Sequence, residues 1–316
     1  MKRKPPLMNR HKSCKNTGLT AGRILVACLL LSASGAYAGN LFETLVGEAE
    51  DVHPGELLDV SFVARSVAGA SIETRPDCSN LLTVASCIWR AAPEGARFPA
   101  ITVKFFKADA KPVKPIWVTQ GRVLVWSKQP QAFRHSVYVP DGAVRAQLCV
   151  ERMEKENAVD VSDISFRHLD GFAQPTRNIN PFFDYGLFNS SGYTFMGSPR
   201  WRVDADGRNW FDLLQGSCYP DPFPVKGDEE IEIRFRGDSP TWLHCYVCFY
   251  PEWKDVGSLN TNKVFFILET KNKSHYPERV KRLKVPVNAT WARIYFQPSG
   301  EIHNLRITGT ASEEGK

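Results

Sequence analysis

The chain has 316 residues, and its composition of 43% hydrophobic, 23% charged and 11% aromatic residues excludes wholesale disorder, a collagen repeat and a coiled coil. Its formal net charge is +6, but seven of its 40 basic residues lie before residue 39, where there is no acidic residue. The rest has 33 basic and 34 acidic residues, so its net charge is −1. We therefore predict no nucleic-acid partner, because such a body has no overall field that attracts polyanions.

Residues 1–38 follow the order of a secretory signal peptide. Residues 1–23 are polar and basic, an apolar run follows from Ile24 to Leu31, and small residues lead to Ala38. Eight apolar residues are far fewer than the roughly 20 that span a bilayer, which favours cleavage after Ala38 over an N-terminal anchor. The run also resembles a lipobox at Cys28, but that cysteine lies inside the run instead of at its end. We predict a secreted, periplasmic or cell-surface protein without a membrane span.

Six cysteines remain after cleavage: Cys78, Cys87, Cys149, Cys218, Cys245 and Cys248. An even number in an oxidising compartment allows up to three disulfides. Cys78 and Cys87 are close together in a loop-like stretch, and we predict that they pair. Each half of the chain has three cysteines, so either one disulfide joins the halves or two thiols remain.

Cys245-Tyr246-Val247-Cys248 has the C-x-x-C spacing of a redox pair or half of a zinc site, and His244 precedes it. The surrounding run 242–250 is typical of a buried strand, in which residues three apart face opposite sides. The two sulfurs could then hardly share one metal ion. We therefore predict packed cysteines or partners in distant disulfides.

Strand patterns dominate the remaining sequence, as short runs rich in Val, Ile, Phe and Tyr that Gly, Pro, Asn and Asp separate. Examples are residues 57–64, 100–106, 121–126, 133–139 and 144–150. Amphipathic helical periodicity is scarce, and its best candidate is 80–90. This pattern predicts an all-β sandwich fold.

Four sequence blocks occur twice, in the same order. They pair 58–64 with 231–237, 103–106 with 247–250, 137–148 with 283–294, and 161–166 with 302–307. A turn glycine, Gly55 or Gly227, precedes the first block of each copy. We predict two tandem β-sandwich domains, at 39–170 and 181–310, with a linker at 171–180 and a tail at 311–316.

The order of these blocks resembles carbohydrate-binding modules with a galactose-binding-like jelly-roll fold. The resemblance rests on the glycine-led strands at 55–58 and 227–230, the closing strand at 163–166, and an aromatic opening of the second copy at 188–189 and 201–210. It implies two jelly-roll domains that bind a polysaccharide or glycan. It also implies a structural calcium ion, to which the sequence assigns no ligands.

Sugar recognition needs flat aromatic faces together with polar side chains for the hydroxyl groups. The second copy is rich in aromatic residues, and three of its tryptophans have polar or charged neighbours: Trp201, Trp210 and Trp253. We predict that these three bind the ligand together with Tyr250 and Arg202. The alternative for each aromatic ring is a place in the core, because β-sandwiches bury several tryptophans.

No metal site or catalytic motif is evident. Asp204-Ala205-Asp206-Gly207 resembles part of a calcium loop, but Arg202 stands at its first ligand position and Asp-Gly favours a tight turn. The chain has no Gly-x-Ser-x-Gly, His-Glu-x-x-His or P-loop sequence. We predict a non-catalytic protein without a cofactor. The alternative to glycan binding is a structural or adhesive envelope protein whose paired sandwiches hold a protein partner.

Overall fold

The computed structural model describes residues 42–69, 71, 98–113, 121–152, 155–186, 189–196, 200–203, 209–212, 217–238, 243–257, 262–268, 278–297 and 301–310. These residues form eighteen β-strands and one short 3-10 helix, which confirms the predicted all-β fold. No helix in these ranges is long and apolar enough to cross a membrane. The candidate helix at 80–90 lies outside the described residues.

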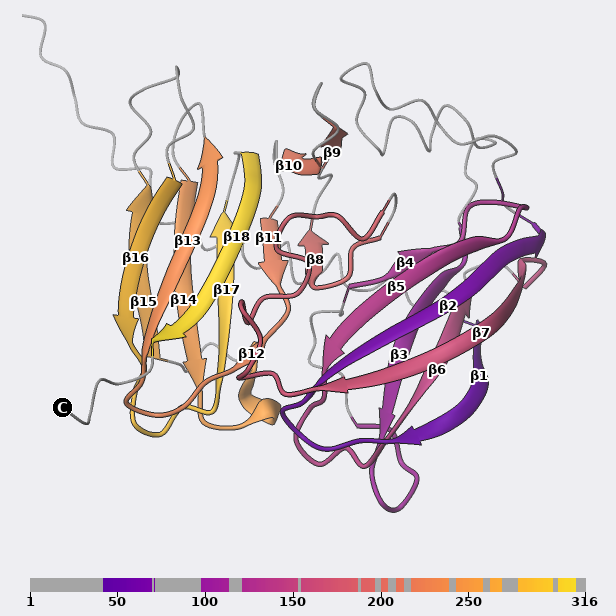
Figure 1. The fold of residues 1–316 in the computed structure, drawn as a ribbon, viewed down its shortest axis with the longest axis horizontal. Helices are drawn as coiled ribbons and strands as arrows, with labels where there is room; N and C mark the ends of the chain where they lie inside the picture. Colours follow the sequence, from indigo (N-terminus) through magenta and orange to yellow (C-terminus); the bar gives the residue numbers. More distant parts are fainter. Residues whose placement is uncertain are drawn as a thin grey trace, which may run out of the picture. The chain divides into compact units, whose positions relative to one another are not determined.

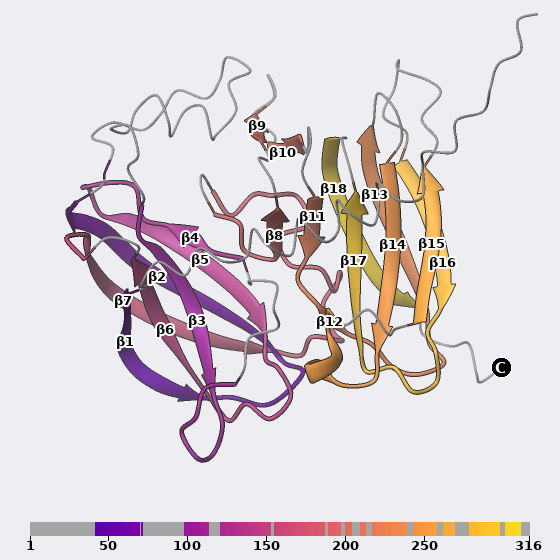
Figure 2. The ribbon, with the colours of Figure 1, turned by 180° about the vertical axis from the view of Figure 1, so that it is seen from behind.

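The first sandwich has two antiparallel sheets, with the strand orders β1-β6-β3-β4 and β5-β2-β7. Its strands are β1 (Phe42–Asp51), β2 (Leu57–Ala68), β3 (Ala100–Phe106), β4 (Val123–Leu124), β5 (Gln131–Tyr138), β6 (Arg145–Arg152) and β7 (Ala158–Leu169). Figure 1 shows this sandwich from the side of β2 and β7, and Figure 2 shows it from the side of β3. Buried apolar residues of both sheets, such as Val60, Phe62, Val103 and Leu148, form one core between them.

The second sandwich is also antiparallel, with the orders β16-β13-β18-β10-β9 and β15-β14-β17-β11-β8, and β12 also pairs with β17. Its elements are β8 (Tyr193–Met196), β9 (Arg200–Val203), β10 (Asn209–Asp212), β11 (Ser217–Pro220), β12 (Phe223–Pro224), β13 (Glu230–Asp238), β14 (Leu243–Tyr250), η1 (Trp253–Asp255), β15 (Asn262–Leu268), β16 (Glu278–Lys284), β17 (Trp291–Gln297) and β18 (Glu301–Thr310). In Figure 1, β13 and β18 lie in front of β14 and β17, and Figure 2 reverses this order.

The two sandwiches repeat each other in strand order and in register. The order β5-β2-β7 corresponds to β16-β13-β18, and β6-β3-β4 corresponds to β17-β14-β15. Equivalent cross-strand pairs, first copy before second, are Leu58–Val137 and Ile231–Leu283, Val60–Phe166 and Ile233–Ile307, and Val103–Leu148 and Val247–Ile294. These are the pairings that the four sequence blocks require, so the predicted tandem duplication is confirmed.

The turn before β2 and β13 differs from the sequence-based expectation in one detail. Gly55 has a positive φ of 84°, and its structural equivalent is Asp228, with a φ of 65°, instead of Gly227. Gly227 has a separate role, since a Cβ atom there would lie 2.0 Å from the carbonyl oxygen of Val287. Both copies thus keep the left-handed turn residue, although only the first copy uses glycine for it.

Four cysteines are described, and all are buried thiols: Cys149, Cys218, Cys245 and Cys248. A disulfide between the halves is therefore not formed among these four. Cys245 and Cys248 lie in the predicted strand β14, which has β15 on one side and β17 on the other. Burial raises the pKa of Cys245 well above its ordinary value. Cys78 and Cys87 lie outside the described residues, so their pairing stays a prediction.

The predicted linker is built into the second sandwich. Arg177, Asn178 and Asn180 are buried, and the Arg177 backbone N–H donates to the Ile307 carbonyl oxygen at 2.7 Å. The Asn178 side chain accepts the Ile307 N–H at 3.0 Å and donates to the Leu305 carbonyl oxygen at 2.5 Å. The polar composition of 171–180 therefore serves buried hydrogen bonds to β18.

Candidate functional site

Two of the predicted ligand-binding residues, Tyr250 and Trp253, are core residues. Tyr250 ends β14 fully buried, and its hydroxyl group lies 2.8 Å from that of Tyr295. Trp253 lies in η1 with 5% of its surface exposed, and its ring packs edge-on against Trp291 at 4.8 Å between centroids. Neither ring has a face open to a ligand. The polar neighbours of Trp253 in the sequence therefore do not indicate an exposed indole ring.

Trp253 belongs to a junction between the two copies. The Asp141 Oδ2 atom, from the turn between β5 and β6, accepts the Trp253 backbone N–H at 3.0 Å and the Trp291 Nε1–H at 3.1 Å. Tyr138 packs edge-on against Trp291 at 6.5 Å. With Leu57 and Trp126, Tyr138 belongs to the same buried cluster as the core of the second sandwich. These aromatic residues therefore join the two copies.

The other three predicted residues, Trp201, Arg202 and Trp210, lie on the strand pair β9–β10. Trp210 is the cross-strand partner of Arg202, and Trp201 is the partner of Phe211. Directly opposed residues of an antiparallel pair share a face, so the positions of Trp210 and Arg202 fall on one face and that of Trp201 falls on the other. The register thus brings two of the predicted residues together and separates the third from them.

The next strand indicates which face is which. Phe211 lies opposite Ile302 of β18, and Ile302 is fully buried in the core. The positions of Trp201 and Phe211 are therefore on the same face of the sheet as the core residue Ile302. The row of Trp210 and Arg202 is on the opposite face of the sheet.

A calcium ion, which the resemblance implies, finds no ligand set in the part of the chain that the structure describes. No three His, Cys, Asp or Glu side chains of these residues come together in a way that could hold a metal ion. The Asp204–Gly207 sequence lies outside the described residues. We therefore derive no role for calcium.

One serine–histidine pair has the contact of a nucleophile and its base. His135 Nδ1 lies 2.6 Å from Ser191 Oγ, and Ser191 also donates to Asn189 Oδ1 at 2.6 Å. Both side chains are fully buried. Burial lowers the pKa of His135 to about 4, against the opposing charge of Asp59. A polymer could not reach this serine, and its hydroxyl hydrogen is already used, so the pair is a structural hydrogen bond.

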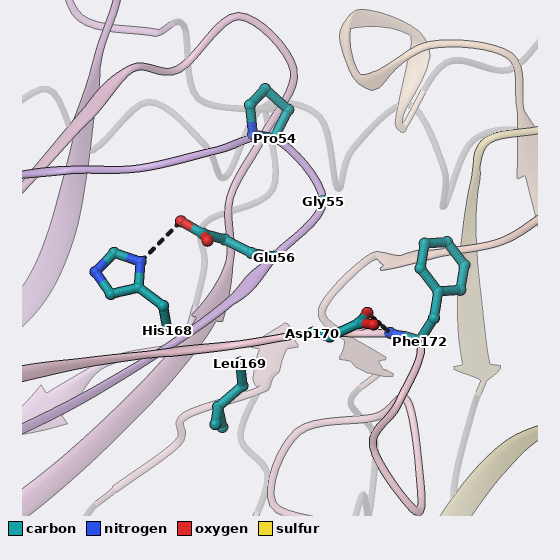
Figure 3. Close-up of a pocket in the computed structure, with 7 residues that line it drawn as sticks. All are labelled: Pro54, Gly55, Glu56, His168, Leu169, Asp170 and Phe172. Atoms are coloured by element: carbon teal, nitrogen blue, oxygen red, sulfur yellow. Dashed lines mark hydrogen bonds and ion pairs between the residues drawn. The ribbon is translucent and has the colours of Figure 1, made fainter.

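An open pocket of about 390 Å³, which the sequence did not predict, lies where the first copy meets the 171–180 segment. We call it the Glu56 pocket, and its walls are Pro54, Gly55, Glu56, His168, Leu169, Asp170 and Phe172. Figure 3 shows Glu56 and His168 on one side of it and Asp170 and Phe172 on the other. The volume is at the small end of the roughly 300–1,000 Å³ that is typical of ligand pockets.

Hydrogen bonds hold the polar side chains of the Glu56 pocket in place. Glu56 Oε1 accepts the His53 backbone N–H at 2.8 Å and lies 3.0 Å from His168 Nδ1, while His168 Nε2 lies 3.1 Å from Glu50 Oε1. Asp170 Oδ1 accepts the Phe172 N–H at 2.8 Å. Partial burial lowers the pKa of His168, but its bonds to Glu50 and Glu56 outweigh that effect and raise the pKa above its ordinary value.

Comparisons with known proteins give distant structural likenesses. No protein-family model and no curated protein matches the chain. Among solved structures it is similar to the N-terminal CBM22-1–CBM22-2 tandem domain from Paenibacillus barcinonensis Xyn10C, with 12% identity, 86% of this chain and 92% of that chain covered, and a TM-score of 0.32.

Two further similar structures differ in their described functions. One comes from work on carbohydrate-binding modules of the β-sandwich superfamily, with 9% identity, 78% of this chain and 98% of that chain covered, and a TM-score of 0.28. The other is the Arthrobacter globiformis T6 isomalto-dextranase complexed with panose, with 9% identity, 82% and 36% covered, and a TM-score of 0.26. Tandem carbohydrate-binding modules are thus among the structural neighbours, but likenesses this distant carry no functional conclusion.

Proposed function

We propose that the protein is exported and binds a polysaccharide without catalysis, through Trp210 and Arg202 of the second sandwich. The observation that carries this proposal is their cross-strand pairing on the face opposite the core row of Ile302. An indole ring can pack on the C–H face of a pyranose, and a neighbouring guanidinium group can donate to its hydroxyl groups. A directly opposed pair offers both kinds of contact to one sugar ring.

Affinity electrophoresis through gels that contain a panel of soluble polysaccharides tests this proposal. We expect at least one polysaccharide to retard the protein. Trp210→Ala should lower the affinity obtained from this retardation at least tenfold, or by about 1.4 kcal/mol. Arg202→Ala should weaken it less. Phe182→Ala is the matched control, because Phe182 is 50% exposed and lies outside β9 and β10.

Two results would decide against the proposal. One is the absence of retardation by every polysaccharide while the near-ultraviolet circular dichroism shows an intact fold, which would favour the protein-partner alternative. The other is equal retardation of Trp210→Ala and the unsubstituted protein. Trp201→Ala separates the two faces, because we expect it to reduce thermal stability more than binding.

Export has its own test. N-terminal sequencing of the protein from the extracytoplasmic fraction should begin at Gly39, because Ala36-Tyr37-Ala38 has the small residues that signal peptidase requires. A chain that keeps residues 1–38 and stays in the cytoplasm would contradict export, while leaving the test of sugar binding unaffected.

A further inference from the structure

The two copies place a glutamate at the same point, just before β2 and β13. Glu56 in the first copy and Glu229 in the second each accept the backbone N–H of the residue three positions earlier, at 2.8 and 2.6 Å. Each also accepts, through its backbone carbonyl oxygen, the N–H of the valine in the Val-Pro sequence after β5 or β16, which is Val139 or Val285. The two carboxylates are therefore structural equivalents in a shared turn.

In the second copy this carboxylate binds a guanidinium group. Arg177 Nη2 donates to Glu229 Oε2 at 2.7 Å, and Nη1 donates to Oε1, so the pair is bidentate. Phe172 packs against this group, with its ring centroid 5.0 Å from Arg177 Cζ. Gly309 provides the space, because a Cβ atom there would lie 2.1 Å from Arg177 Nη2.

The first copy has the same carboxylate but no arginine beside it among the described residues. His168 stands at the position equivalent to Gly309, as the cross-strand pairs Leu58–His168 and Ile231–Gly309 show. Its Nδ1 atom lies 3.0 Å from Glu56 Oε1, and His53 Nδ1 lies 4.0 Å from Glu56 Oε2. The space next to this carboxylate is the Glu56 pocket.

We propose that the Glu56 pocket binds the guanidinium group of an arginine side chain from a partner polypeptide. Glu56 Oε2 would accept two of its N–H groups or share them with the Asp170 carboxylate, which is exposed. The Phe172 ring lines the pocket but already packs against two other cations, with Arg177 Cζ at 5.0 Å and Lys226 Nζ at 4.7 Å from its centroid. The arrangement would reproduce in the first copy the contact that Arg177 makes in the second. This proposal goes beyond sugar binding and does not rest on it.

The test uses three capped tripeptides with the full-length protein: Gly-Arg-Gly, Gly-Lys-Gly and Gly-citrulline-Gly. Saturation-transfer NMR should detect the arginine peptide and not the citrulline peptide, which has nearly the same shape without the charge. The lysine peptide should bind more weakly, since an ammonium group cannot form the bidentate pair. Glucosamine is a fourth probe, for a cation carried by a sugar.

Variants locate the binding. Glu56→Gln keeps an oxygen for the His53 N–H and should weaken binding of the arginine peptide at least tenfold. Asp170→Asn, at an exposed position, should weaken it less and covers the case in which Glu56→Gln misfolds. Glu252→Gln, a 57% exposed carboxylate beside Lys254, is the matched control and should bind normally.

Each remaining outcome overturns the proposal. Equal binding of the arginine and citrulline peptides would show that charge is not recognised. Unchanged affinity in both pocket variants would show that the peptide binds outside the Glu56 pocket. Absence of binding of the arginine peptide to the folded protein would show that the pocket does not bind arginine. Binding of glucosamine in preference to arginine would assign the pocket to an amino sugar instead of a peptide.

Discussion

The two copies share a strand framework but satisfy one equivalent carboxylate in different ways. In the second copy, Glu229 is enclosed by the bidentate guanidinium group of Arg177, which comes from the segment between the copies. In the first copy, Glu56 shares one oxygen with His168 and lies beside an open pocket. The same turn therefore places its carboxylate in a closed ion pair in the second copy and at the wall of an open pocket in the first copy.

Breaking the Arg177–Glu229 pair should have the largest effect. Arg177→Met leaves a nearly buried carboxylate without its cation, so we expect the free energy of unfolding to fall by about 3–5 kcal/mol in urea titrations. Gly309→His on this background supplies the histidine that the first copy has, and should recover part of the loss. Arg282→Met is the control, because Arg282 is 64% exposed and Glu232 keeps its second partner, Arg234, so this change should cost below about 1 kcal/mol. A loss this small for Arg177→Met would contradict the closed-pair interpretation.

The second prediction concerns pH and His135, whose equivalent in the second copy is the exposed Lys281. Burial depresses the folded-state pKa of His135 from 6.5 to about 4, so its stability contribution is complete above pH 6.5 and is lost as pH falls toward 4. The loss amounts to about 3 kcal/mol at 1.36 kcal/mol per pH unit.

Chemical denaturation between pH 7 and 4.5 measures this effect. His135→Asn should flatten the acid-induced fall in stability, whereas Lys281→Asn should leave it unchanged. Burial raises the pKa of Asp221 to about 6, which acts in the opposite direction over this range, but Asp221 is present in all three proteins and cancels from the comparison. Equal pH profiles for His135→Asn and the unsubstituted protein would contradict the prediction.

The smallest expected effect comes from the junction. Asp141 is equivalent to Val287, which is 74% exposed, yet Asp141 accepts hydrogen bonds from Trp253 and Trp291 of the other copy. Asp141→Val leaves two donors without this acceptor, and we expect a loss of about 2 kcal/mol and a changed tryptophan fluorescence spectrum. The reverse change, Val287→Asp, should alter stability by less than about 0.5 kcal/mol. Equal effects of the two changes would show that Asp141 does not secure the junction.

The sequence predicted the core strands because alternating apolar residues have only one way to face a shared core. The repeated blocks even specified the register, as the equivalence of Leu58–Val137 with Ile231–Leu283 shows. It did not predict β1, because half of the run Phe42–Asp51 is polar or charged and the strand lies at a sheet edge with little burial. Edge strands depend on a neighbour for their hydrogen bonds more than on their own apolar pattern.

The candidate site was harder to predict for two physical reasons. Trp253 has charged neighbours, but Glu252 and Lys254 pair with each other in solvent, while the 3-10 turn directs the indole ring inward. The Glu56 pocket depends on a contact between Glu56 and His168, which are far apart in the chain. The one available signal was the recurrence of glutamate at the same place in both copies, and it indicated a shared turn without showing what fills the space beside it.

The buried thiols allow the opening of each sandwich to be measured separately. Burial raises the pKa of Cys149 to about 11 and that of Cys218 well above its ordinary value, so alkylating reagents meet almost no thiolate while the strands are closed. Cys149 lies in β6 and Cys218 in β11, one in each copy. The labelling rate of each cysteine, followed by mass spectrometry, therefore measures how often its own sandwich opens, independently of the other sandwich.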